Sequence, residues 1–217
     1  MSKSNPSQSI HLDDYWKECV ASVCYESTFF HFLKKIADTK SISIYDYGET
    51  IGLSKSRICQ LRNNGSRLGT KLLQKLLESG ELDKTQKEQL LELEKTPAER
   101  MKLIARLKTE NFPLLPESDL DSKVMKAGQL TPAGWKKNKE GSHLQFPTAV
   151  KLCFALHCSV NQAKELLSYS GFHWDEKWDN EFSHNFMHFV RLKLEKCCWD
   201  LQQVIYDYWV WKQHKAA

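Results

Sequence analysis

A short basic segment around residue 57 carries side chains that could contact nucleic acid. Arginine and glutamine can each make paired hydrogen bonds to a guanine or adenine edge, lysine neutralises phosphate, and serine reaches either target. Ile58 and Leu61 lie three residues apart among these polar residues, so a helix here would have one apolar and one polar face. The pattern fits a DNA-reading helix and, equally, an ordinary amphipathic surface helix. The four polar residues are Lys55, Ser56, Arg57 and Gln60.

The residues before this segment have the signals of a turn between two helices. Gly52 would end one helix, Leu53 would place an apolar side chain in the turn, and Ser54 could cap the next helix through its hydroxyl. Gly48 lies within the preceding helix, where glycine allows another backbone to approach closely. The Asn-Asn-Gly run at residues 63–65 would end the second helix. The sequence therefore predicts two helices joined by a tight turn.

Charge is distributed unevenly along a chain whose net charge is only +4. Residues 28–77 contain nine basic and three acidic residues, residues 78–121 contain seven and eleven, and residues 122–151 contain six and one. Between residues 55 and 75 there are six basic residues and no acidic one. Two basic blocks separated by an acidic block indicate two anion-facing surfaces, as in nucleic-acid-binding proteins, although clustered charge is often only a solvated face.

Residues 28–95 are expected to form one small all-α domain. Ahead of it, residues 1–27 combine a flexible polar lead with an added helix that would pack on this domain. Apolar stripes with helical spacing run through residues 11–37, with a break near residues 25–27. Further helices are predicted over residues 45–51, 55–63, 70–77 and 84–95.

Residues 96–117 are expected to connect the two halves of the chain. A Thr-Pro pair opens a helix over residues 98–108, because proline is compatible with the first helical turn. Pro113 and Pro116 then push the residues before them out of the α conformation, which places the domain boundary there.

Residues 118–217 are expected to form a second helical domain that is a looser copy of the first. A short helix ending at Gly128 precedes a Thr-Pro helix start at Thr131 and a basic helix, and two apolar helices follow. This order parallels residues 44–93 and predicts an internal repeat.

The helical tail over residues 179–211 is unusually aromatic. More aromatic rings than a small domain can bury would indicate an interface, either between two copies or with a protein partner. The alternative is a helix pair in the core of the second domain, which is the commoner use of such stripes. The aromatic residues are Phe182, Phe186, Phe189, Trp199, Tyr206, Tyr208, Trp209 and Trp211.

A longer motif can be assembled around the turn. It consists of Glu49-Thr50-Ile51-Gly52-Leu53-Ser54-Lys55-Ser56, then Ile58, Gln60, Leu61, Asn63 or Asn64, and Gly65, followed by a leucine-rich helix. With this motif, residues 28–77 resemble the Cro/phage-repressor-type (xenobiotic response element) helix-turn-helix family. The resemblance implies a lambda-repressor-like fold whose helix over residues 55–63 enters the major groove of double-stranded DNA. The residues implied to contact DNA are Lys55, Ser56, Arg57, Gln60, Arg62, Asn63, Arg67 and Lys71.

Two positions depart from the family's pattern. Ile44 stands where a glutamine usually holds a phosphate, and Gly48 stands where alanine is usual. The first departure removes one phosphate contact and leaves the rest of the motif in place.

Residues 119–208 look like the second half of bacterial two-part regulators of the same broad group. The resemblance is carried by residues 124–128, 135–137, 148–152 and 163–172. It implies that Lys136 and Lys137 contact DNA. The departures are an extra residue between Gly128 and Leu130, Gly134 within the reading helix, and Asn138 at an expected apolar position. This half would then bind DNA weakly, or serve as a copy that oligomerises or binds a partner.

The remaining chemistry-bearing residues do not complete a recognisable site. His184 and His188 have the spacing of two metal ligands on a helix, but no third ligand accompanies them. The other candidate ligands are Cys153 with His157 or Cys158, and the Cys197-Cys198 pair. The sequence has no nucleophile elbow, phosphate-binding P-loop or zinc-protease motif. We therefore expect no metal, no cofactor and no enzymatic activity.

Cysteine usage and hydropathy indicate a cytoplasmic protein. The seven cysteines are odd in number and have no C-x-x-C spacing, which fits reduced thiols. No apolar run reaches the roughly 18 residues that cross a bilayer, and the first residues lack the apolar core of a secretion signal. No membrane association is expected.

Together these features predict an all-α protein of two tandem helix-turn-helix domains with an N-terminal helix and a C-terminal aromatic extension. The predicted function is a homodimeric, sequence-specific DNA-binding regulator that represses by occluding a promoter. The alternative is an interaction module, either antitoxin-like or an accessory to phage defence or a mobile element. In that case DNA would be the tether, and residues 179–211 would bind a protein partner.

Overall fold

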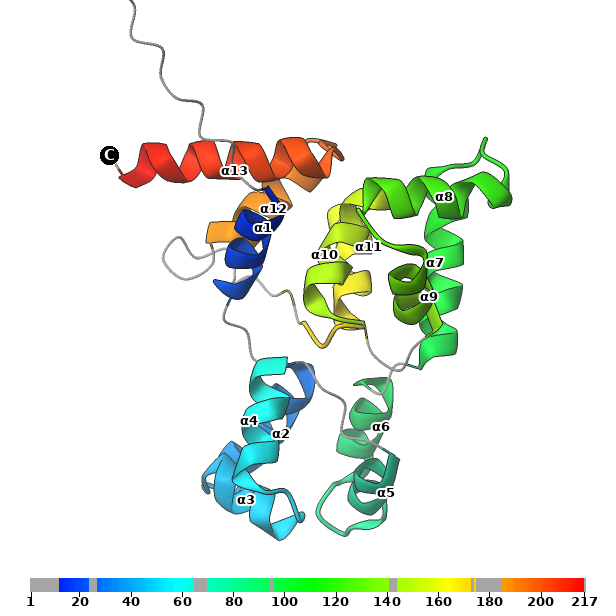
Figure 1. Ribbon diagram of the computed structural model, residues 1–217. Helices are drawn as coiled ribbons and strands as arrows, with labels where there is room; N and C mark the ends of the chain where they lie inside the picture. The colour runs from blue at the N-terminus through cyan, green and yellow to red at the C-terminus, as the bar shows by residue number, and fades with distance from the viewer. Residues whose placement is uncertain are drawn as a thin grey trace, which may run out of the picture.

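The computed structural model describes residues 12–23, 27–64, 70–93, 96–140, 144–172, 174 and 185–216. Within these ranges the regular elements are helices, which confirms the all-α class (Figure 1). The helices are α1 (Leu12–Ala21), α2 (Thr28–Thr39), α3 (Ile44–Thr50), α4 (Lys55–Asn64), α5 (Thr70–Glu78), α6 (Lys84–Leu93), α7 (Pro97–Asn111), α8 (Glu117–Ala127), α9 (Pro132–Glu140), α10 (Phe146–Ala155), α11 (Val160–Ser168), α12 (Asn185–Glu195) and α13 (Leu201–Ala216).

Helices α2 to α6 enclose the smaller of two hydrophobic cores. Helix α2 packs against α3, α4 and α6, and its Leu33 is completely buried. Tyr47 of α3, Ile58 and Leu61 of α4, and Leu90 of α6 fill the same core. The apolar spacing therefore places the buried face of α4 as the sequence predicts.

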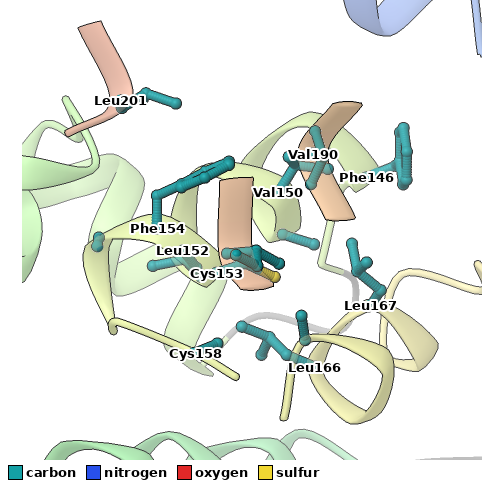
Figure 2. Packing of buried hydrophobic residues seen from close by; sticks show 14 of the residues in the cluster. Phe146, Val150, Leu152, Cys153, Phe154, Cys158, Leu166, Leu167, Val190 and Leu201 are labelled. Carbon is teal, nitrogen blue, oxygen red and sulfur yellow. The ribbon is translucent and has the colours of Figure 1, made fainter. Parts of the chain in front are cut away.

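The larger core is built around α10, in the half of the molecule opposite α2–α6 (Figure 1). Seven residues of α10 are buried, so this helix is apolar on nearly every side. A helix of that kind needs neighbours all round it. Side chains of α11, α12 and α13 surround it in Figure 2. The labelled residues are Phe146, Val150, Leu152, Cys153, Phe154, Cys158, Leu166, Leu167, Val190 and Leu201.

Helices α1 and α7 also belong to this larger core, which differs from the expected domain plan. The added N-terminal helix packs on α13 and not on the first domain, because the ring of Tyr15 meets an aromatic partner on α13 and that of Trp16 meets one on α12. The ring centroids of Trp16 and Phe186 are 5.6 Å apart, and those of Tyr15 and Tyr208 are 6.2 Å apart. Residues 96–117 are likewise more than a linker, since the apolar face of α7 is buried in this core. Its buried apolar residues are Leu103, Ile104 and Leu107.

Three rings of the aromatic tail are packed inside the chain. Phe186, Phe189 and Tyr208 are buried, and the Phe189 ring lies 5.2 Å from that of Tyr208. Trp199, Trp209 and Trp211 are half-buried, and Tyr206 is 48% exposed. The core interpretation of the tail therefore holds for these rings, while Phe182 lies outside the described residues.

Ser27 joins the two cores at the carboxyl end of α4. It is completely buried, its hydroxyl donates to the carbonyl of Leu61, and its N–H donates to the carbonyl of Arg62 at 3.3 Å. It also forms an isolated antiparallel bridge with Phe172, a residue of the larger core. The end of α4 is thus fixed to both halves of the molecule.

Helices α3 and α4 and helices α8 and α9 are joined by turns with the same hydrogen bonds. Each turn has four residues, 51–54 and 128–131. The N–H of Leu53 donates to the carbonyl of Gly48 at 2.7 Å, and the N–H of Leu130 donates to that of Met125 at 2.8 Å. We call α3, residues 51–54 and α4 the first turn unit, and α8, residues 128–131 and α9 the second turn unit.

The backbone angles and caps of the two turn units also agree. The second residue of each turn has a positive φ, 78° at Gly52 and 52° at Gln129. The fourth residue caps the following helix: Ser54 accepts from the N–H of Arg57 at 3.2 Å, and Thr131 accepts from that of Gly134 at 3.1 Å. The sequence pattern suggested that Gln129 is an extra residue, and this interpretation is wrong. Gln129 takes the place of Gly52.

The repeat continues through the next two helices. At the start of α6, the N–H of Gln86 donates to Oδ1 of Asp83 at 2.8 Å, and the N–H of Asp83 donates to Oε1 of Gln86 at 3.0 Å. Ser159 and Gln162 form the same capping box at the start of α11. Equivalent buried positions include Tyr47 and Val124, Ile58 and Trp135, Leu82 and Cys158, and Leu90 and Leu166. The predicted internal repeat is therefore visible in the backbone as well as in the core.

Candidate nucleic-acid interface

Helix α4 carries the exposed polar residues on which the sequence prediction depends. Ile58 and Leu61 anchor its inner face in the smaller core. Lys55, Ser56 and Gln60 are exposed, and Arg57 is half-buried. These four residues lie on one short, capped helix, whose outer face could contact a flat or grooved surface.

A close crossing between α3 and α4 sets the position of this helix. A Cβ on Gly48 would overlap Cδ1 of Ile58 and lie 3.2 Å from its Cγ1. Only a residue without a side chain lets the buried isoleucine sit this close to α3. A close approach at Gly48 is present, but the approaching group is the Ile58 side chain and not another backbone, which the sequence predicted.

Arg57 and Gln60 interact with each other on the outer face of α4. One guanidinium nitrogen of Arg57 donates to Oε1 of Gln60 at 3.1 Å. Because these residues lie three positions apart, the bond links adjacent turns of the helix. It holds the two side chains together as one polar group on the outer face of the helix.

The basic residues around α4 come from several elements. Arg62 lies with its guanidinium 5.6 Å from the ring centroid of Phe30, and Lys71 is exposed on α5. Lys75 has its amine 2.6 Å from the position of a Cβ on Gly52, so it lies over the turn, a location that the sequence analysis did not predict. The side chain of Asn63 and all of Arg67 lie outside the described residues.

The second turn unit presents a different surface at the equivalent positions. Ala133 and Gly134 occupy the places of Ser56 and Arg57, and Lys137 occupies that of Gln60. Lys136 and Lys137 are exposed, as the prediction required. This surface keeps positive charge but lacks the arginine and glutamine that suit base edges.

Ser27 is a buried residue that positions α4, a role that the sequence did not predict. It caps α2 by accepting from the N–H of Phe30 at 3.2 Å and fixes the last turn of α4. The cap could have been recognised from Ser-Thr before an apolar helical run. Its contact with α4 could not, because the two segments are far apart in sequence.

The described residues contain no group of three or more histidine, cysteine, aspartate or glutamate side chains placed to hold a metal ion. His188 is half-buried on α12, while His184 lies outside the described residues. None of the helices in the described part of the chain is long and apolar enough to cross a membrane.

Comparisons of the chain with models of known protein families, with curated proteins and with solved structures found no match.

Proposed function

We propose that the protein is a sequence-specific, double-stranded DNA-binding regulator of the Cro/phage-repressor helix-turn-helix type. The observation that carries the proposal is the outer face of α4, where Arg57 and Gln60 are hydrogen-bonded together on a helix fixed by the Gly48 crossing. A polar helix after a four-residue turn, held by a buried inner face, has the geometry of a recognition helix.

In this proposal α4 enters the major groove. Arg57 reads a guanine through O6 and N7, and Gln60 contacts the adjacent base pair. Lys55, Arg62 and Lys71 contact backbone phosphates and set the register of the helix. Lys136 and Lys137 add phosphate contacts from the second turn unit without reading bases.

The regulator acts as a homodimer that represses by covering a promoter. Two copies related by two-fold symmetry would place two α4 helices in successive major grooves, with half-sites about 10 bp apart or a multiple of that distance. Selecting bound DNA from a random pool tests this arrangement. A palindromic site supports the homodimer, and two unlike half-sites contradict it.

Alanine substitutions test the base-reading role on the selected site. Arg57→Ala and Gln60→Ala should each cost about 1–3 kcal/mol on that site and little on scrambled DNA. Lys71→Ala should instead weaken binding to both DNAs and lower the salt dependence by about one released ion. Lys102→Ala, an exposed lysine on α7, is the matched control. Equal losses on both DNAs for Arg57→Ala would refute the reading role.

A second candidate function is favoured by Ala133 and Gly134 in the second turn unit. This unit keeps the fold but lacks base-reading side chains, which suits a copy that binds a protein partner while the first unit holds DNA. A stoichiometric partner that co-purifies with the chain and protects α9 or α13 from labelling would support this role.

A further inference from the structure

A cavity of about 570 Å³ lies behind the second turn unit. Its wall is made by the last turns of α8, the turn after it, the α10–α11 turn and the start of α13. The volume is in the range of small-molecule sites. Residues important to its chemistry are Lys123, Lys126, Gln129, His157 and Trp199.

Two aromatic rings, those of His157 and Trp199, line the cavity, and the ring of Phe112 packs against His157. The rings of Phe112 and His157 are 4.6 Å apart, and those of His157 and Trp199 are 5.2 Å apart at 66°. Burial and the neighbouring Lys123 charge lower the pKa of His157 to about 4, so its imidazole is neutral at pH 7. Trp199 is only half-buried, which leaves ring surface accessible from the cavity.

Positive charge in the cavity comes from Lys123 and Lys126, which lie one turn apart on α8 and are both exposed. The acidic residue in the lining is Asp200. Its Oδ1 accepts from the N–H groups of Gln202 at 2.9 Å and Gln203 at 3.2 Å. This carboxylate therefore caps α13. The lining contains two lysines against one aspartate, and the amine of Lys123 also lies 4.9 Å from the ring centroid of Phe112.

The equivalent surface of the first turn unit has the opposite charge. Asp46 and Glu49 of α3 take the places of Lys123 and Lys126. When positions are counted back from the caps of α6 and α11, Glu81 takes the place of His157. Trp199 comes from the segment before α13, which lies beyond the repeated helices. The cavity is therefore not a by-product of the repeated fold, since its basic and aromatic groups occur on one copy only.

We propose that this cavity binds a small organic anion that carries a planar ring and is about the size of a nucleotide. The ammonium groups of Lys123 and Lys126 bind the anionic group. The ring stacks on Trp199, and the amide of Gln129 hydrogen-bonds its edge. The site goes beyond the proposed DNA contacts and requires no DNA.

Calorimetric titration of the full chain without DNA tests this site. The probes are four ribonucleoside monophosphates and salicylate. Each nucleotide is compared with its own nucleoside, and every probe is compared with inorganic phosphate. We expect saturable one-site binding by at least one ring-bearing anion, at least tenfold tighter than its uncharged or ringless counterpart. No saturable binding by any of the five, or equally tight binding of inorganic phosphate, would overturn the proposal.

Residues of the first copy supply the matched variants. Lys123→Asp and Lys126→Glu introduce the residues found at the equivalent positions of α3, and each should weaken probe binding at least tenfold. Trp199→Leu should do the same through loss of stacking. Lys164→Glu, an exposed lysine on α11 outside the lining, should leave binding unchanged. Unchanged binding in Lys126→Glu, with a native thermal transition, would contradict the assigned site.

Discussion

In the first turn unit the outer positions of the second helix carry Ser56, Arg57 and Gln60, whereas in the second they carry Ala133, Gly134 and Lys137. The two turns nevertheless share their hydrogen bonds, the sign of φ at the second residue and the cap at the fourth. The backbone is therefore set by the inner face and the turn, and the outer face can change without altering it. Fold and surface chemistry vary separately in this molecule.

The largest expected effect concerns the inner face of α4. Leu61 is completely buried, and Asn138 takes its place in α9, where it is half-buried and its Nδ2 donates to the carbonyl of Gly134 at 2.7 Å. Leu61→Asn should lower the free energy of unfolding by about 3–5 kcal/mol, because it removes apolar burial and buries an amide. Asn138→Leu should change it by less than about 1 kcal/mol. Urea unfolding measures both, and a similar cost at the two sites would break the comparison.

The crossing of the two helices provides the next test. Gly48→Val should cost about 2–3 kcal/mol, because its side chain would overlap buried Ile58. Met125→Val at the equivalent position should cost less than about 1.5 kcal/mol, since that crossing already accommodates a side chain. Adding Ile58→Ala to Gly48→Val should give less than the sum of the two single losses. Additive losses in urea unfolding would show that the crossing is not the cause.

Much of this comparison can be derived from the sequence, and part of it cannot. Local signals sufficed for helix order, the caps at Ser54 and Thr131, and the close approach at Gly48, because each depends on neighbours along the chain. The location of α1 depends on which distant surface buries Trp16, and local periodicity does not contain that information. Gln129 was misread because a positive φ suggests glycine, although other residues can adopt it at a modest cost.

The same turn position gives a smaller expected effect. Gly52→Ala should cost about 1–2 kcal/mol, because a Cβ at φ 78° is strained and would approach the amine of Lys75. Gln129→Gly should raise stability by about 0.5–1 kcal/mol, since relief of the strain at φ 52° exceeds the added freedom of the unfolded chain. Thermal unfolding of the two variants measures both changes in stability. A loss of stability in Gln129→Gly would mean that the glutamine side chain supports the turn more than its backbone strain opposes it.

The last expected effect is a pH dependence of stability that comes from the second copy. His157 has a folded pKa of about 4, against about 6.5 when unfolded, so the unfolded chain binds more protons between these values. The neutral imidazole of His157 makes its full contribution to the free energy of unfolding above pH 6.5. This contribution is lost as pH falls toward 4, by about 1–2 kcal/mol after allowance for the partial exposure of the side chain. His157→Asn, which tolerates the positive φ of 53°, should flatten this part of the stability profile. Ordinary carboxylate protonation remains in both proteins, so the difference between their urea profiles isolates the histidine. Parallel profiles from pH 4 to 6.5 would show that His157 accepts a proton in the fold as readily as it does in water.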